Sequence, residues 1–185
     1  MMVRCVHTDR DRMKQNSKIQ AGIEVMLEKQ EQNMLTIRRY IPADQQAVEY
    51  LHVYVIQQTG AYLGRGPWDD DIYAIEATYL NNSGEFLIGE DAGQVVAMGA
   101  LRRTSATRAE IKRMRVHPTY QGRGIGQRIL NELEARARTL GYTTLHLDTS
   151  TIQITAQKLY EKNGFHEVGR KPLRHVEIIL YEKEL

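Results

Sequence analysis

The stretch YQGRGIGQR, residues 120–128, joins a segment with strand character to one with helical periodicity. A glycine-rich turn between a strand and a helix leaves backbone N–H groups free, and the helix dipole adds positive potential at the same point. Glycine lets a phosphate approach this backbone and permits a positive φ. The stretch therefore predicts a phosphate site, to which Arg123 and Arg128 can add charge. The alternative is a tight turn with solvated arginines.

Strand and helix patterns alternate on both sides of this turn. AEIKRMRV (109–116) predicts a strand before it, and an apolar period of 3.6 residues predicts a helix after it, ending at Gly141. The other predicted elements are a strand at 35–40, a helix ending near residue 60, a short helix at 72–80, a hairpin at 85–103 with its turn at 91–93, a strand at 143–150, a helix at 154–163 and two closing strands. This order predicts the fold class α+β, loosely α/β, with a mixed sheet covered by helices.

The first 33 residues differ from the rest of the chain. They begin polar and aperiodic, and Ser17 then opens a capping-box pattern that predicts an amphipathic helix. One face of this helix carries Ile19, Ile23, Met26, Leu27 and Gln30. We therefore predict an N-terminal extension (1–33), with Met34 as a candidate natural start, and one domain (34–185). The apolar face needs a surface to cover, which makes a homodimer one expectation.

Composition narrows the class of protein. A net charge of +2 in 185 residues is too mild for a protein that coats nucleic acid, so we expect no nucleic-acid partner. The single cysteine, Cys5, excludes an internal disulfide, and neither a signal peptide nor a membrane-spanning apolar run occurs. The sequence thus predicts a soluble, cytoplasmic protein without a membrane partner. His7, His117, His146, His166 and His175 lack metal-ligand spacing, and we expect no metal.

Two familiar phosphate loops fit the glycine turn poorly. A Walker A loop needs Gly-Lys followed by Ser or Thr, and the chain has none. A dinucleotide fingerprint that uses Gly122 and Gly124 needs a third glycine where Gln127 stands. Asp148 nevertheless ends a predicted strand at about the distance of a ribose-binding acid. An NAD-binding oxidoreductase is therefore kept as an alternative.

Three motifs in register carry a resemblance to a known family. Gln121-Gly-Arg-Gly-Ile-Gly126 resembles the acyl-CoA pyrophosphate loop of the GNAT superfamily of N-acetyltransferases. AEIKRMRVHPTY (109–120) resembles its central strand, and ITAQKLYEKNGF (154–165) resembles its second signature, which ends Leu-Tyr-Glu-Lys, one residue, Gly-Phe. Order and spacing agree over residues 34–185, which raises the specificity of each motif. The resemblance implies an acetyltransferase that uses acetyl-CoA as cosubstrate.

The resemblance also implies how acetyl-CoA binds. Its pantetheine arm lies beside the central strand like an added strand, where the backbone of Met114, Arg115 and Val116 bonds to it. The Val116 N–H is the implied donor to the thioester oxygen. The residues implied for the pyrophosphate are Gln121, Gly122, Arg123, Gly124, Ile125, Gly126 and Gln127. Gln153 stands where the family commonly has an asparagine that contacts the cofactor.

Charges on the predicted central strand point to an open cleft. A strand buried on both faces is near-continuously apolar, whereas this strand carries Lys112, Arg113 and Arg115. We therefore expect a cleft beside it. In the alternative, these long side chains reach solvent at a sheet edge.

The resemblance implies two catalytic residues. Tyr160 lies where the family often places the general acid that protonates the departing thiolate, although a packing tyrosine is the alternative. Glu110 lies where some members carry the glutamate that takes a proton from the amine, directly or through water. A solvated charge at a strand end is the alternative for Glu110.

The loop GRGPWDDD (64–71) is the best sequence clue to the acceptor. Asp69, Asp70 and Asp71 beside Trp68 can hold a cationic amine by charge and by cation–π contact. Capping of a following helix is the alternative. The predicted reaction is direct acetyl transfer to a primary amine in a ternary complex. A non-catalytic regulatory module that senses acyl-CoA is a second hypothesis, beside the NAD-binding oxidoreductase.

Overall fold

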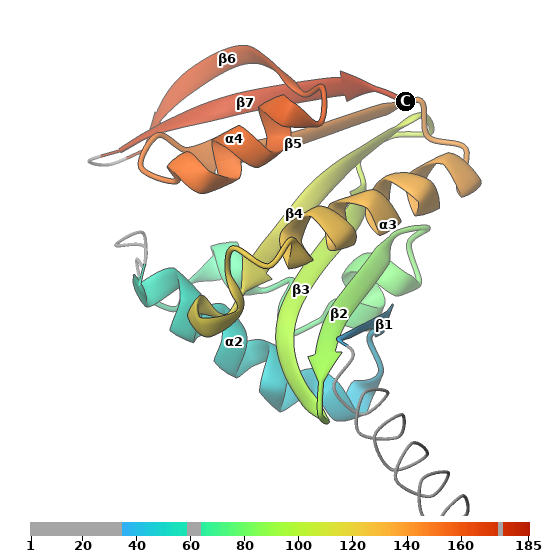
Figure 1. Ribbon diagram of the computed structural model, residues 1–185. Helices are drawn as coiled ribbons and strands as arrows, with labels where there is room; N and C mark the ends of the chain where they lie inside the picture. Colours follow the sequence, from blue (N-terminus) through green and yellow to red (C-terminus); the bar gives the residue numbers. More distant parts are fainter. Residues whose placement is uncertain (1–34, 59–63, 174–175) are drawn as a thin grey trace, which may run out of the picture. The chain divides into compact units, whose positions relative to one another are not determined.

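The computed structural model describes residues 35–58, 64–173 and 176–185, which form a seven-stranded sheet with helices on both faces (Figure 1). The strand order is β1-β2-β3-β4-β5-β7-β6. The β4–β5 pair is parallel, and the other strand pairs in the described part of the chain are antiparallel. The predicted α+β class with a mixed sheet is confirmed. The helix predicted within residues 1–33 lies outside the described residues.

The bounds of the elements follow the predicted order. The strands are β1 (Thr36–Arg39), β2 (Glu85–Asp91), β3 (Gln94–Arg103), β4 (Arg108–Val116), β5 (Thr144–Ser150), β6 (His166–Leu173) and β7 (Val176–Glu184). The α-helices are α2 (Gln45–Gln58), α3 (Ile125–Thr139) and α4 (Ile154–Lys162). Short 3-10 helices cover Pro42–Asp44, Pro67–Asp69 and Pro118–Tyr120. None of the helices within these described ranges has the length and apolar character that crossing a bilayer demands.

The short helix predicted at 72–80 is the least accurate element. Only Glu76–Leu80 is helical, and it is a π-helix in which the Asn81 N–H donates to the Glu76 carbonyl. The residues before it form tight turns instead, because Ile72 and Tyr73 donate to carbonyls three residues back.

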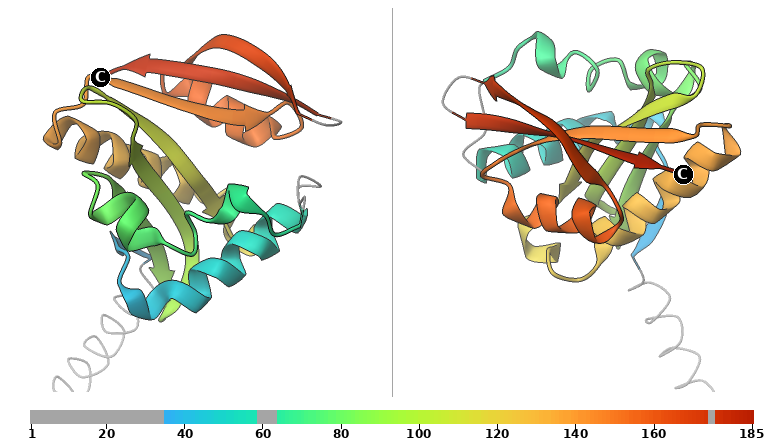
Figure 2. Two further views of the ribbon diagram at one scale, coloured as in Figure 1. Left: turned by 180° about the vertical axis from the view of Figure 1, so that it is seen from behind. Right: turned by 90° about the horizontal axis from the view of Figure 1, so that it is seen from above.

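Two helices cover opposite faces of β3. Met98 and Ala100 belong to the core cluster that includes Val48 and Leu51 of α2. Gly99, between them, points to the other face, where a Cβ would lie 2.5 Å from Ile129 Cγ2 of α3. A glycine is needed here because α3 packs directly on the strand. Figure 2 shows α2 and α3 on opposite sides of the sheet.

β4 and β5 pair only over a short length. Arg108 pairs with Thr144, and the last paired residues are Glu110 and His146. Beyond them the two strands diverge, while β5 continues to pair with β7 up to Ser150 (Figure 1). Backbone groups of β4 beyond Glu110 therefore lack a neighbouring strand on this side. This divergence opens the sheet at its centre, as the charges on β4 predicted.

Candidate active site

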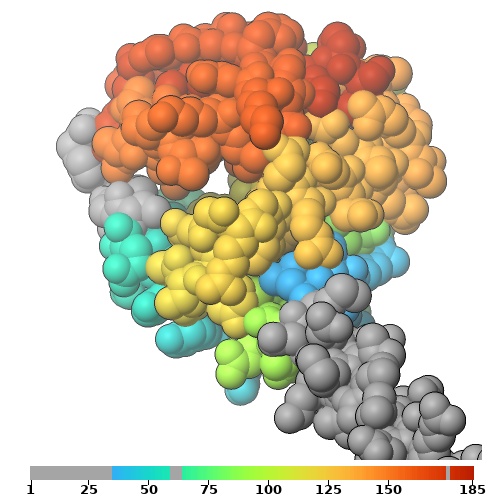
Figure 3. Space-filling view, viewed as in Figure 1, coloured from blue at the N-terminus to red at the C-terminus, as the bar shows by residue number. Residues whose placement is uncertain are grey.

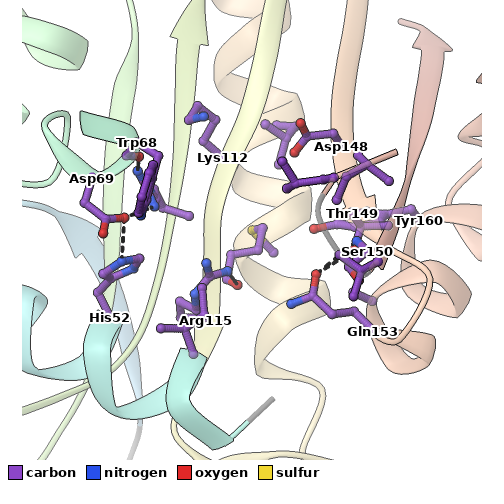
Figure 4. A pocket seen from close by; sticks show the side chains of 18 residues that line it. His52, Trp68, Asp69, Lys112, Arg115, Asp148, Thr149, Ser150, Gln153 and Tyr160 are labelled. Atoms are coloured by element: carbon purple, nitrogen blue, oxygen red, sulfur yellow. Dashed lines mark hydrogen bonds and ion pairs between the residues drawn. The ribbon is translucent and has the colours of Figure 1, made fainter. Parts of the chain in front are cut away.

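A cavity of about 310 Å³ lies where β4 and β5 diverge. Figure 3 shows the molecular surface hollowed between the part that contains α4 and the segment that follows β4. The lining residues come from α2, the 64–71 loop, β4, β5, α4 and the adjoining ends of β6 and β7. They are His52, Ile56, Trp68, Asp69, Ile111, Lys112, Arg113, Met114, Arg115, Asp148, Thr149, Ser150, Gln153, Ala156, Tyr160, Leu173, Val176 and Ile178 (Figure 4).

A β-bulge in β4 shapes one wall. Met98 of β3 pairs with Arg115 and Ala100 pairs with Lys112, so Arg113 and Met114 together lie opposite Gly99. Arg113 has a φ of 55°, which is unusual for a residue with a Cβ. The bulge redirects the Arg113 side chain toward the 64–71 loop.

Arg113 neutralises two aspartates of that loop. Its Nε donates to Asp71 Oδ2 at 2.9 Å, its Nη1 donates to Asp69 Oδ1 at 3.2 Å, and its Nη2 donates to the Trp68 carbonyl. Tyr79 also donates its hydroxyl hydrogen to Asp71. Burial acts to raise the pKa of Asp71, but the hydrogen bond and charge of Arg113 outweigh it and hold the pKa below its ordinary value.

The sequence left two hypotheses for the aspartates of this loop, which were binding of a cationic amine and capping of the following helix. The observed hydrogen bonds agree with neither. Asp69 and Asp71 already have a cationic partner, and the helix that follows the loop, Glu76–Leu80, has Ile75 as its N-cap with no side-chain cap. Asp70 is exposed and does not line the cavity. The aspartates instead anchor the loop to the bulge, a contact that sequence spacing does not reveal.

His52 is a cavity residue that sequence analysis missed. It lies on the buried face of α2 with Val48, Leu51 and Val55, and its Nε2 is 3.0 Å from Asp69 Oδ1. Burial, together with the charges of arginines on β4, lowers the pKa of His52 to about 4, so the ring is neutral at neutral pH. The sequence did contain a sign of this role, which is a histidine within the otherwise apolar face of the helix.

Arg115 lies in the middle of the cavity, between the wall that carries His52 and the wall that carries Tyr160 (Figure 4). Its Nη1 donates to the carbonyl of the preceding Met114 at 2.8 Å, and its buried Nε has no hydrogen-bond partner among the described residues. Burial, reinforced by the charge of Arg113, lowers the pKa of Arg115 to about 10. The guanidinium therefore remains charged at neutral pH.

Tyr160 lines the opposite wall from α4. Only 5% of it is exposed, and its ring packs edge-on against Phe165 with 5.8 Å between ring centroids. Burial raises the pKa of Tyr160 to about 12, and the charge of Arg115 acts in the opposite direction. Tyr160 is thus both a packed side chain and a neutral hydroxyl at the cavity.

Glu110 does not line the cavity. It is the last residue of β4 that pairs with β5, and it is 8% exposed. Arg102 Nε donates to its Oε2 at 3.0 Å, and Lys112 Nζ lies 3.6 Å from its Oε1. The structure therefore separates Glu110 from Tyr160, the other residue implied to be catalytic, and connects it to the cavity through Lys112.

The glycine turn has the backbone that an anion site needs. Gly122 and Gly124 have φ values of 75° and 76°, and nothing lies within 4 Å of a Cβ built on either residue. Gly124 is the N-cap of α3, whose first N–H groups have no partner within the helix. Ile125, the first residue of α3, is buried, and a Cβ built on Gly126 would lie 3.7 Å from Leu159 Cδ2.

The polar side chains of the turn have partners of their own. Gln121 donates from its amide to the Val116 carbonyl at 3.0 Å, and the Arg123 guanidinium lies 5.0 Å from the ring centroid of Tyr120. Gln127 exchanges two hydrogen bonds with Asn163, which ties α3 to the end of α4. The side chain of Gln127 is therefore occupied, and its backbone N–H is the donor that an anion can use.

The β4 backbone faces the gap at its end. The His117 N–H donates to Val96 of β3 at 2.8 Å. Because successive amides of a strand point in opposite directions, the Val116 N–H points away from β3. Met114 turns its side chain to the other face, where its Sδ would lie 2.7 Å from a Cβ on Gly99.

Gln153 and Asp148 line the cavity from the β5 side. Gln153 Oε1 accepts a hydrogen bond from Thr149 Oγ1 at 3.0 Å, so the side chain bridges the end of β5 and the start of α4. Asp148 is about half exposed and lies 3.5 Å from Lys171 Nζ. Among the residues that the structure describes, no three His, Cys, Asp or Glu side chains form a candidate metal-ligand set.

Comparison with known proteins identifies the family. The model of the Acetyltransferase (GNAT) family matches residues 43–165. The chain therefore belongs to the GNAT family and is an N-acetyltransferase. This family uses acetyl-CoA, and the unpaired edge of β4 together with the open glycine turn fits that molecule. The sheet, with a single parallel pair among its described strands, gives the dinucleotide alternative no support.

The most similar relatives include acetyltransferases of different length. The chain is 34% identical over 143 residues to an IAA acetyltransferase of Azospirillum brasilense, covering 73% of this chain and 86% of the relative. It is 33% identical over 101 residues to N-acetylaspartate synthetase of Danio rerio, covering 54% of this chain and 36% of the relative. It is 30% identical over 123 residues to N-acetyltransferase 8 of Homo sapiens, covering 59% of this chain and 54% of the relative. The chain thus spans about half or less of the last two relatives.

Solved structures show the same fold. An acetyltransferase from Streptococcus agalactiae superposes with a TM-score of 0.73 at 26% identity, covering 82% of this chain and 98% of that one. A Salmonella typhimurium protein solved with its cofactor acetyl-CoA superposes with a TM-score of 0.70 at 22% identity, covering 82% of this chain and 94% of that one. The second likeness supports the fold alone.

Proposed function

We propose that this enzyme passes an acetyl group from acetyl-CoA to a primary amine by direct attack within a ternary complex. The observation that carries the proposal is the cavity at the divergence of β4 and β5, with the open glycine turn beyond the end of β4 and Tyr160 on the opposite wall. Bound acetyl-CoA supplies an activated acetyl thioester. One cavity that receives the thioester and an amine together permits direct transfer.

Two sets of backbone N–H groups are proposed to stabilise negative charge, one at the reacting carbonyl and one at the pyrophosphate. The outward Val116 N–H donates to the oxygen of the reacting carbonyl, where negative charge grows during attack. The backbone N–H groups at Gly122, Gly124 and Gly126 hold the pyrophosphate, helped by the positive end of the α3 dipole. Arg123 adds charge from the exposed side of the turn.

Proton transfers are assigned to Tyr160 and Glu110. Tyr160, neutral at rest, donates its hydroxyl proton to the departing sulfur. Glu110 lies outside the cavity lining, so it accepts the proton of the ammonium form of the substrate through water. The 3.6 Å contact between Glu110 and the cavity residue Lys112 gives the route on which this water would lie.

The acceptor is proposed to be a small molecule with a primary amine. One relative is named for an acetylated amino acid, which supports N-acetylation of a small acceptor. A cytoplasmic location and a homodimer remain predictions that rest on the sequence.

Calorimetric titration with acetyl-CoA tests the proposal, with NADH as the control ligand. We expect acetyl-CoA to bind and NADH not to bind, and we expect thiol release when an amine panel is added. Selective NADH binding would overturn the proposal. Tight acetyl-CoA binding without thiol release from any amine would instead indicate a module that senses acyl-CoA.

A further inference from the structure

Two arginines on β4 enter the cavity in contrasting states. Arg113 is bound by Asp69 and Asp71, so its charge is compensated. Arg115 has no carboxylate within ion-pair distance among the described residues, and its buried Nε has no hydrogen-bond partner there. A buried cation is costly unless an anion and hydrogen-bond acceptors accompany it. A ligand that enters the cavity can supply both.

Among the described residues that line the cavity, Arg115 is the cation that no ion pair compensates. The acidic lining residues are Asp69 and Asp148, of which the first is bound by Arg113 and the second is about half exposed beside Lys171. Lys112 and Arg115 are the other cations of the lining, and Lys112 Nζ lies 3.6 Å from Glu110 Oε1, which leaves Arg115 without an anionic partner in the described part of the chain. The electrostatics therefore favour an anionic group near the middle of the cavity.

The position of Arg115 separates this anion from the phosphates of acetyl-CoA. Met114 points toward α3, so Arg115, the next residue along β4, points to the face that carries α2 and His52. The open glycine turn lies beyond the end of β4, after His117. The anion that Arg115 can bind therefore belongs to the acceptor.

His52 provides a second unpartnered atom in the same lining. Asp69, paired with Arg113, only accepts hydrogen bonds, so His52 Nε2 carries the ring proton and donates to it. The buried Nδ1 then holds a lone pair, with no donor bonded to it in the described part of the chain. An amino group on the acceptor can donate an N–H hydrogen bond to this lone pair.

We infer that the acceptor is an amino acid, or a similar amino carboxylate, whose carboxylate binds the guanidinium of Arg115. The planar guanidinium matches a carboxylate through two parallel N–H donors, which a neutral amide cannot replace with equal strength. This inference rests on the proposed acetyl transfer, because it names the substrate class of the same site.

Binding to the CoA-saturated protein tests the inference without requiring turnover. The probes are the common amino acids and, for each, its carboxamide, titrated by calorimetry into the protein with CoA present. We expect at least one amino acid to bind about 100-fold more tightly than its carboxamide. We expect Arg115→Gln to reduce that preference to less than about 5-fold. Arg103→Gln, an exposed arginine outside the cavity, is the matched control that keeps the preference.

The outcomes separate this inference from acetyl transfer itself. If carboxamides or simple amines bind as tightly as the acids and give equal thiol release from acetyl-CoA, the protein is an acetyltransferase but Arg115 does not select the acceptor. That result would overturn the inference. The absence of binding by every acid, or an unchanged preference in Arg115→Gln, would also overturn it. Acids that bind through Arg115 without thiol release would support the inference and count against the proposed transfer. The comparison in the unmodified protein stands even where the variant fails to fold.

Discussion

Arg113 and Asp71 lie 42 residues apart in the sequence, and Arg113 Nε donates to Asp71 Oδ2 at 2.9 Å. The pair fastens the loop that carries Trp68 to the bulge of β4, so this wall of the cavity is held by the strand that also borders the proposed acetyl-CoA site. The side chains of both residues are about nine-tenths buried.

Removal of this arginine should destabilise the fold. Arg113→Met leaves the carboxylates of Asp69 and Asp71 buried without their cation, and we expect a loss of about 3–5 kcal/mol in the free energy of unfolding. Urea denaturation measures the loss. Arg103→Met, at an exposed position, should change the value by less than about 0.5 kcal/mol. A loss below about 1 kcal/mol in Arg113→Met would show that the network contributes little.

Stability should fall in mild acid because of His52. Its pKa is lowered from 6.5 to about 4 by burial and by the charges of Arg115 and Arg113, which outweigh Asp69. Between these two values the unfolded chain binds a proton that the folded chain does not, so stability is complete above pH 6.5 and decreases as the pH falls toward 4. We expect a decrease of roughly 1–3 kcal/mol over this window.

His52→Gln tests this assignment, because the amide can still donate to Asp69 and does not titrate. Unfolding followed at several pH values should show a weaker dependence in the variant between pH 6.5 and about 4. Equal slopes in both proteins would rule out His52 as the source.

Loss of the Tyr160 hydroxyl should impair turnover and leave acetyl-CoA binding intact. We expect Tyr160→Phe to lower kcat by about 10²- to 10⁴-fold, because the sulfur then departs without its acid. Its Kd for acetyl-CoA should stay within about 3-fold, since the ring that packs on Phe165 remains. Tyr181→Phe is the control, because it removes a neighbouring hydroxyl that bonds to Glu161 and does not line the cavity. Wild-type turnover in Tyr160→Phe would remove this residue from the mechanism.

Gly124→Val should abolish acetyl-CoA binding in a folded protein. The side chain would occupy the open space beside the turn and block the approach of phosphate to the backbone. Gly93 has a similar φ of 79° with nothing within 4 Å of a built Cβ, so Gly93→Val imposes comparable strain in the β2–β3 hairpin. Calorimetry should show acetyl-CoA binding in the hairpin variant alone. Unchanged affinity in Gly124→Val would disprove the pyrophosphate assignment.

The role of Glu110 is tested by its amide. With Glu110 as proton acceptor, we expect Glu110→Gln to lower kcat/KM by about 10²-fold at neutral pH and to lose less at alkaline pH, where more of the amine is already neutral. Glu132→Gln on the exposed face of α3 is the control. A uniform loss at every pH would indicate that Glu110 acts through the ion pair with Arg102 rather than as a base.

Local patterns were enough for much of the fold. Periodicity located β4, α3 and α4, and the hairpin turn at 91–93 was found where Asp91 pairs with Gln94. The glycine turn was predicted with its positive φ values because these depend on a few neighbouring residues, and its binding of an anion stays a prediction. The helix predicted at 72–80 was too long, since the tight turns at Ile72 and Tyr73 follow from contacts that periodicity does not describe.

By itself, the sequence determined the family, the order of the elements and the backbone of the glycine turn, because each depends on residues near one another in the chain. Only the tertiary structure decided which charges meet. It paired Arg113 with the loop aspartates, turned Glu110 toward Arg102, and brought His52 and Arg115 into one cavity. These pairings follow from strand register, a bulge and the divergence of β4 from β5, and they join side chains from distant segments.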